Sequence, residues 1–293
     1  MNETPDPARN RSLFEAHGRD FLDNRYVYPV LSRRAGGISI GVNINRDKAC
    51  NFDCVYCQVD RTTSPDSEAV ELPRLADELR RLVDEVLSGR IYEETKFRDV
   101  PEPLRRLCDI AISGDGEPTM CAQFEQVVAA CAEVRAKCPD DVKLVLITNA
   151  TLLHREPVRR GVEILDRNRG EIWAKLDAGT EAYYRQIARS AVPWQQILDN
   201  LSEAARQRPI VIQTLFTRIH DAPPLADEQQ AYCDRLGEIV AAGGRIKLVQ
   251  IHTTARRPAE PWVRSLADAE VDAVAELVRR RTGLPVAVSY GAL

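Results

Sequence analysis

The feature that most constrains the fold is a repeated alternation of short apolar segments with segments of helical spacing. Six apolar segments, mostly rich in Val, Ile or Leu, are predicted to be buried strands, at residues 38–45, 108–114, 142–149, 171–179, 209–217 and 245–253. Five other segments carry their apolar residues on one helical face, at residues 72–89, 123–138, 193–208, 225–244 and 265–283. This order predicts right-handed β-α-β units that build one parallel sheet.

An α/β fold with a partial barrel follows from that count. Six strand–helix units fall short of the eight of a closed barrel, so we expect a partial (βα)6 TIM-like barrel with parallel strands. Its core should cover about residues 36–255, with residues 1–35 and 256–293 as short N- and C-terminal extensions. The chain has 293 residues, and α/β barrels of this size form one unit, so a single domain over residues 1–293 is expected.

Composition and charge limit the expected cellular location and the expected class of substrate. Apolar residues make up 44% and charged residues 29% of the chain, as in soluble globular proteins. The polar start MNETPDPARNRS lacks the apolar run of a secretory signal, and no apolar stretch approaches the roughly 18 residues of a membrane span. We therefore expect a cytoplasmic protein without a membrane partner. The net charge of −4 gives no general attraction to nucleic acid, which favours a small-molecule substrate.

Three of the eight cysteines lie close together in CNFDCVYCQVD, residues 50–60, as Cys50, Cys54 and Cys57. In a reducing compartment such a group indicates metal binding or catalysis rather than disulfides. The group follows the first predicted strand, at the edge where α/β barrels build their active sites. Structural zinc sites and most iron–sulfur clusters use four protein ligands, so three thiolates would leave one metal position open. No second Cys/His pair lies at zinc spacing.

The Cys-x3-Cys-x2-Cys pattern, with the aromatic Tyr56 before its third cysteine, resembles the signature of radical S-adenosylmethionine enzymes. The segment ISGDGEPTM, residues 112–120, looks like the Gly-Gly-Glu-Pro motif of that family, with Asp115 at its first glycine. The segment ITNATLL, residues 147–153, is similar to the family's Thr-Asn-Gly turn, with Ala150 in place of glycine. The resemblance covers roughly residues 36–255. The residues in and around these motifs are most similar to those of the branch that contains wyosine-type tRNA-modifying enzymes and glycyl-radical-enzyme activases.

The resemblance implies both the cofactors and the reaction. The three cysteines would hold a [4Fe–4S] cluster, and S-adenosylmethionine would bind the iron that lacks a cysteine ligand. An external one-electron donor, of the flavodoxin or ferredoxin type, would reduce the cluster. Cleavage of S-adenosylmethionine would then give a 5′-deoxyadenosyl radical that abstracts hydrogen from the substrate.

The resemblance also implies which residues contact S-adenosylmethionine. The Gly-Glu-Pro segment binds the methionyl amino group in relatives, and the later strands reach its carboxylate, ribose and adenine. Side chains alternate between the two faces of a strand, so polar side chains near the strand ends are expected to point into the barrel mouth. Buried in the core, they would lack hydrogen-bond partners. The predicted cofactor residues are Tyr56, Gly114, Asp115, Gly116, Glu117, Thr148, Asn149, Lys175, Asp177, Gln213 and His252.

Two arginines are predicted to bind the substrate. Arg256 and Arg257 directly follow the sixth strand, and guanidinium groups pair bidentately with carboxylate or phosphate. A surface ion pair is the other interpretation of these residues. Three alternative functions stay open at this point: radical modification of a tRNA base or a glycyl-radical partner protein, formation of a 3-amino-3-carboxypropyl radical, and metal binding without catalysis.

Overall fold

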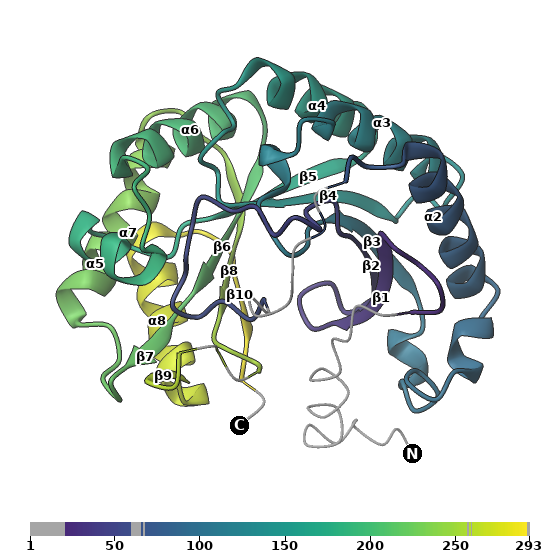
Figure 1. The fold of residues 1–293 in the computed structure, drawn as a ribbon. Helices are drawn as coiled ribbons and strands as arrows, with labels where there is room; N and C mark the ends of the chain where they lie inside the picture. Colours follow the sequence, from purple (N-terminus) through teal and green to yellow (C-terminus); the bar gives the residue numbers. More distant parts are fainter. Residues whose placement is uncertain (1–20, 60–65, 67, 257, 259, 292–293) are drawn as a thin grey trace.

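The structure is a computed structural model that describes residues 21–59, 66, 68–256, 258 and 260–291 (Figure 1). The predicted substrate residue Arg257 lies outside the described residues.

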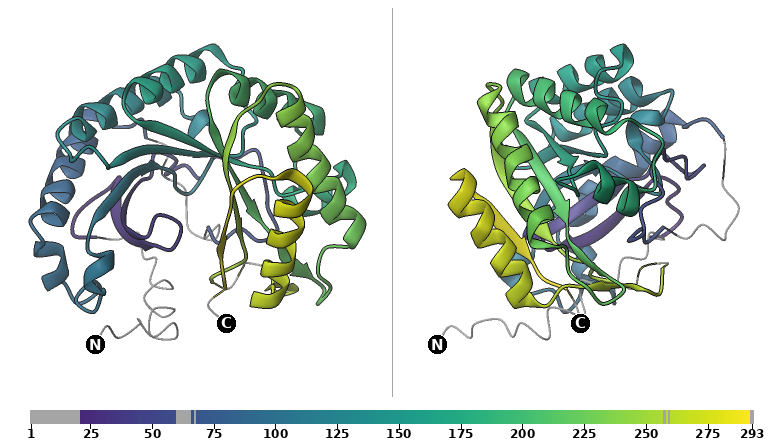
Figure 2. Two further views of the ribbon diagram at one scale, coloured as in Figure 1. Left: turned by 180° about the vertical axis from the view of Figure 1, so that it is seen from behind. Right: turned by 90° about the vertical axis from the view of Figure 1, so that its left-hand side faces the viewer.

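An eight-stranded sheet forms the centre of the molecule, in the order β1-β2-β3-β4-β5-β6-β8-β10. The sheet curls into a partial barrel with the helices outside it, and the wall stays open between β1 and β10 (Figures 1 and 2). The strands are β1 (Val27–Ser32), β2 (Gly37–Val42), β3 (Leu107–Ile112), β4 (Lys143–Thr148), β5 (Gly170–Lys175), β6 (Ile210–Leu215), β8 (Ile246–His252) and β10 (Val286–Ser289).

All six predicted strands occur, as β2 to β6 and β8, and neighbours among them pair in parallel. The predicted partial TIM-like barrel is therefore confirmed. The count of six strands was too low, because both segments expected as extensions add a strand to the sheet. Strand β1 pairs antiparallel with β2, and β10 pairs parallel with β8. Pro29 within β1 and the four-residue length of β10 weaken their sequence signals.

Seven α-helices lie within the described residues and cover the convex face of the sheet (Figure 2). They are α2 (Leu72–Leu87), α3 (Phe124–Arg135), α4 (Glu156–Arg167), α5 (Glu181–Ala188), α6 (Trp194–Gln207), α7 (Ala226–Ala241) and α8 (Asp268–Thr282). Single 3-10 turns are η1 (Arg90–Glu93), η2 (Glu102–Leu104) and η3 (Pro118–Met120). No described helix is both long and apolar enough to cross a membrane.

Helices α4 and α5 were not predicted. Helix α5 has only eight residues, too few to show a clear helical period. Helix α4 contains Gly161, a residue that lowers helix propensity. A Cβ at Gly161 would come within 2.6 Å of the Phe124 ring on α3, so glycine allows the two helices to approach closely.

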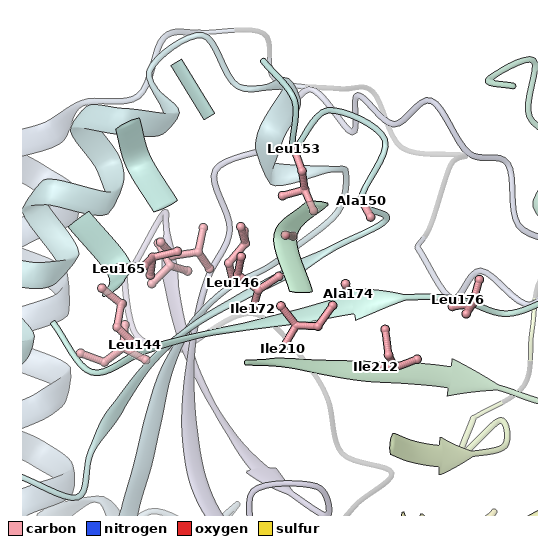
Figure 3. Packing of buried hydrophobic residues seen from close by; sticks show 14 of the residues in the cluster. Leu144, Leu146, Ala150, Leu153, Leu165, Ile172, Ala174, Leu176, Ile210 and Ile212 are labelled. Carbon is pink, nitrogen blue, oxygen red and sulfur yellow. The ribbon is translucent and has the colours of Figure 1, made fainter. Parts of the chain in front are cut away.

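Side-chain alternation gives the strands one face toward the helices and one toward the barrel interior. Leu144, Leu146, Ile172 and Ile212 lie on the helix side, where they are buried in the main core (Figure 3). A smaller apolar cluster fills part of the interior and consists of Ala111, Val145, Trp173 and Val211. A second, two-stranded sheet of β7 (Thr217–Ile219) and β9 (Val263–Ser265) lies beyond the end of β6.

Candidate active site

The loop that carries the three cysteines leaves the end of β2 and crosses the end of the barrel (Figure 1, dark blue). Two backbone hydrogen bonds tie it to the end of α5, from Asp53 N to Ala188 O and from Val55 N to Ile187 O, both at 2.9 Å. The Ser190 hydroxyl adds a third anchor by donating to the Asn51 carbonyl at 2.7 Å. The cysteine loop is therefore fixed by a helix more than 120 residues away in sequence.

All three cysteine side chains, Cys50, Cys54 and Cys57, are partly buried and free of disulfides. Burial and the nearby Asp177 carboxylate raise the pKa of the Cys54 thiol. A bound cation would have to offset that shift, because a metal ligand must be a thiolate. In the described part of the chain, no three His, Cys, Asp or Glu side chains converge on a single metal-ion position. The thiolates of a cubane each bind a different iron, so convergence on one point is not required.

Tyr56 links the cysteine loop to the ends of β5 and β6. Its hydroxyl donates a hydrogen bond to Asp177, and the Lys175 ammonium lies 5.3 Å from the centre of its ring. Asp177 also pairs with Lys175 at 3.0 Å and accepts from the Leu215 backbone N–H at 2.7 Å. Three of the predicted cofactor residues thus form one network beside Cys54.

The segment after β3 packs against the start of the cysteine loop through two glycines. A Cβ at Gly116 would come within 2.1 Å of the Ala49 carbonyl oxygen, and one at Gly114 within 2.1 Å of Asn43 Oδ1. The next residue, Glu117, donates its backbone N–H to the same Ala49 carbonyl at 2.9 Å. Only glycine fits such an approach of two backbones.

The Glu117 carboxylate is buried and joins two loops. Its Oε1 accepts from the Thr119 hydroxyl at 2.5 Å, the Thr119 N–H at 3.2 Å and the Thr148 hydroxyl at 2.6 Å. Its Oε2 accepts from the Asn149 N–H at 2.7 Å. Burial raises the pKa of Glu117, while these donors act in the opposite direction. These hydrogen bonds hold Glu117, Thr148 and Asn149 together and connect the loops after β3 and β4.

Asn149 extends this connection to the cysteine loop. Its side-chain amide donates to Asn51 Oδ1 at 2.7 Å, and the Asn51 amide donates to the Thr151 hydroxyl at 2.8 Å. The adjacent Ala150 has a φ of 64°, the left-handed conformation that glycine adopts most easily. The three loops after β2, β3 and β4 therefore form one hydrogen-bonded unit.

The remaining predicted residues lie around the same end of the barrel. Asp115 accepts from the Asn43 amide at 2.6 Å, and Gln213 donates to Gln250 at 3.1 Å. His252 lines the interior cavity, and Arg256 follows it at the cavity mouth. The Arg256 carbonyl accepts from Gln58 of the cysteine loop at 2.8 Å.

Two buried polar atoms near these loops have no hydrogen-bond partner among the described residues, Asn45 Oδ1 and His252 Nδ1. Burial lowers the pKa of His252 well below its ordinary value, so its imidazole is neutral. Unsatisfied buried atoms of this kind are rare in proteins and fit a bound ligand. The thiols, the close glycine segment and these two atoms are thus compatible with an iron–sulfur cluster and a polar cofactor.

A cavity of about 260 Å³ occupies the barrel interior. It extends from Gln58 on the cysteine loop to Arg33 and Arg34 in the turn between β1 and β2, and Trp173 forms part of its wall. Sequence reasoning missed both arginines, because an Arg-Arg pair in a turn is typical of a solvated surface. The antiparallel pairing of β1 with β2 is what places this turn beside the cavity.

Comparison with known proteins supports this description. A family model described as the Radical SAM superfamily matches residues 44–221, more than half of the chain. UPF0026 protein MJ1312 of Methanocaldococcus jannaschii is 29% identical over 161 residues, which cover 55% of this chain and 43% of that protein. The GTPase Obg of Brachyspira hyodysenteriae is 24% identical over 252 residues, which cover 85% of this chain and 32% of that protein. These matches span less than half the length of either curated relative.

This sequence contains no Gly-Lys-Ser/Thr of a phosphate-binding P-loop. Among solved structures, TYW1 with a lysine-pyruvate adduct bound superimposes with a TM-score of 0.51 at 16% identity, over 84% of this chain and 74% of that chain. At that identity the likeness concerns the fold alone. On the strength of the family model, the chain belongs to the radical SAM superfamily, an enzyme family that uses a [4Fe–4S] cluster and S-adenosylmethionine.

Proposed function

We propose that this enzyme cleaves S-adenosylmethionine to a 5′-deoxyadenosyl radical and removes a hydrogen atom from a small, anionic substrate held in the barrel. The observation that carries the proposal is the continuous cavity from Gln58, next to Cys57, into the arginine-lined interior. A substrate in that cavity would lie next to the cysteine loop.

The cofactor would be held by the cysteine loop and its neighbours. Cys50, Cys54 and Cys57 are the residues that would bind the cluster, with the backbone around Gly116 toward the methionyl end. When bound, the cluster and S-adenosylmethionine supply the hydrogen-abstracting radical, with methionine as the second product. One electron per cleavage must come from an external donor, for which a flavodoxin- or ferredoxin-like protein is the expected partner.

The protein's own part is to orient the reactants and exclude water. The Tyr56–Asp177 hydrogen bond and the Glu117 contacts hold the loops after β2 to β5 in a fixed arrangement. The neutral His252 offers an unpaired ring nitrogen, Nδ1, to a ligand in the cavity. Arg256, at the mouth, supplies positive charge for an anionic group.

The size of the cavity favours a metabolite over a macromolecule. Its volume of about 260 Å³ lies below the roughly 300–1,000 Å³ of pockets that take drug-sized ligands. A net charge of −4 also gives no broad attraction to RNA.

The test is product analysis after anaerobic reconstitution with iron and sulfide and reduction in the presence of S-adenosylmethionine. Release of 5′-deoxyadenosine and methionine is expected, and methylthioadenosine would instead indicate a 3-amino-3-carboxypropyl radical. Cys54→Ala should lose iron and turnover, while Cys138→Ala, a matched change at a partly buried cysteine on the outer layer, should keep both. Full iron and turnover in Cys54→Ala would overturn the cluster assignment.

A further inference from the structure

The turn between β1 and β2 places two adjacent arginines at the interior cavity, where Arg33 is half-buried and Arg34 is exposed. Strand β1 ends at Ser32, which pairs with Gly37 at the start of β2. Arg33 and Arg34 therefore lie at the end of β2 opposite the cysteine loop, and both line the interior cavity. The Arg34 guanidinium lies 6.0 Å from the Trp173 ring centre, within the barrel wall.

These arginines differ from the structural arginines of the same protein. Buried Arg135 donates to the Val142 carbonyl at 2.8 Å and to the Asp140 carbonyl at 2.9 Å. Within the described ranges, neither Arg33 nor Arg34 forms a hydrogen bond or an ion pair. A guanidinium has five N–H donors, so both side chains keep their binding capacity for a ligand.

The surrounding charges leave this end of the cavity positive. Partial burial, together with Arg34 and Arg256, lowers the pKa of Arg33 to about 10, whereas the Arg34 side chain is exposed. A guanidinium group stays protonated in proteins, so both arginines carry positive charge at neutral pH. The carboxylate that acts on Arg34 is Asp109, which already accepts a hydrogen bond from the Ser39 hydroxyl. The positive charges of Arg33, Arg34 and Arg256 repel one another, so each disfavours the charged form of its neighbours.

Among the described residues, the acidic Glu171 does not relieve that repulsion. Glu171 begins β5 at the same edge of the sheet, but it pairs with Lys143 at 3.0 Å and Lys247 at 2.6 Å. The Trp173 indole N–H also donates to Glu171 at 3.0 Å. Glu171 is thus neutralised by its own partners.

We propose that Arg33 and Arg34 form an anion-binding subsite that takes the carboxylate or phosphate group of the substrate. This inference rests on the proposed function and deepens it. An anionic group held at these arginines would direct the rest of the substrate along the cavity toward Gln58 and the cysteine loop. A neutral nucleobase or the backbone of a peptide glycine offers no group that satisfies the pair, so the enzyme selects small organic anions.

Direct binding measurements test the subsite without any turnover. The reconstituted enzyme, unreduced and with S-adenosylmethionine present, is titrated calorimetrically under anaerobic conditions with succinate, inorganic phosphate and neutral succinamide. We expect at least one of the two anions to bind more tightly than succinamide. The anion that binds more tightly shows whether the anionic group of the substrate is a carboxylate or a phosphate.

Arg34→Gln and Arg33→Gln should each weaken that binding roughly 10- to 100-fold, because each removes charge-assisted hydrogen bonds. Arg34→Lys keeps the charge but loses the planar fork, so a smaller loss is expected and this variant also serves if a Gln variant fails to fold. Arg280→Gln, an exposed change on α8, is the matched control and should bind as the wild type does.

Wild-type affinity in all the Arg33 and Arg34 variants, or no preference of the wild type for either anion over succinamide, would overturn the subsite. The 5′-deoxyadenosine assay is read separately on the wild type. Failure of radical formation would therefore refute the proposed function while the binding result still decides the subsite.

Discussion

The Tyr56 hydroxyl donates a hydrogen bond to the Asp177 carboxylate and so joins the cysteine loop to the end of β5. The two residues are 121 positions apart in the sequence. This bond holds the cysteine motif, which is defined by local spacing, in a fixed position relative to the far side of the barrel.

Tyr56→Phe should lower the free energy of unfolding by about 1–3 kcal/mol, because it removes a donor to a buried carboxylate. Chelators should also remove iron from the reconstituted variant faster than from the wild type. Denaturant unfolding and iron release measure the two effects. The control is Tyr290→Phe, which removes a hydroxyl that donates to Asp272 at 2.8 Å on the exposed surface. It should change stability by less than about 0.5 kcal/mol; equal losses in both variants would contradict the linking role of Tyr56.

Gly116→Ala should displace the cysteine loop, because the added Cβ would meet the Ala49 carbonyl at 2.1 Å. Backbone atoms on both sides leave little room to relax. We therefore expect the free energy of unfolding to fall by roughly 1–3 kcal/mol and the iron content after reconstitution to be lower. Gly237→Ala is the opposite case, since nothing lies within 4 Å of a Cβ on that helical glycine. This variant should have a free energy of unfolding about 0.5–1 kcal/mol higher than that of the wild type. A stable, fully loaded Gly116→Ala protein would show that the close approach is not needed.

Glu117→Gln should destabilise the protein by roughly 1–3 kcal/mol, because an amide nitrogen would replace an oxygen that accepts hydrogen bonds from N–H or O–H donors. If Glu117 instead served only the cofactor, stability without cofactor would stay at the wild-type value. Urea unfolding of the cluster-free protein separates the two roles. Glu125→Gln, which affects an exposed pair with Arg160, should cost less than about 1 kcal/mol.

The contribution of Asp109 to the free energy of unfolding should fall as pH rises from about 4 to 6. Burial raises the pKa of Asp109 from 3.8 to about 6, against the opposing effects of Ser39, Arg34 and Lys143, while Glu171 adds to the rise. The folded state then binds more protons than the unfolded state in this range, so deprotonation costs stability.

Asp109→Asn should remove this pH dependence and be more stable than the wild type by roughly 1–3 kcal/mol at pH 7 to 8. The difference should shrink toward pH 4. Asparagine keeps an oxygen for the Ser39 hydroxyl, so the hydrogen bond itself is preserved. Urea unfolding at each pH is the measurement, and parallel pH profiles for the two proteins would refute the assignment.

Much of the fold was predictable from local patterns. Apolar strands and amphipathic helices repeat along the chain with periods that depend only on backbone geometry, so β2 to β6 and β8 and five helices were found within a few residues. Strands β1 and β10 were missed because a proline and a short length hide their period, and they are stabilised by pairing with β2 and β8.

The family and its three cysteines could be identified from the sequence alone, because their spacing in one loop is a local property. The folded arrangement was needed to show that Glu117 is enclosed by Thr119, Thr148 and Asn149, and that Arg33 and Arg34 line the cavity. An arginine pair in a turn has the same sequence signature whether it meets water or a barrel interior. Which of the two it meets depends on the pairing of β1 with β2, and on packing between residues distant in the chain.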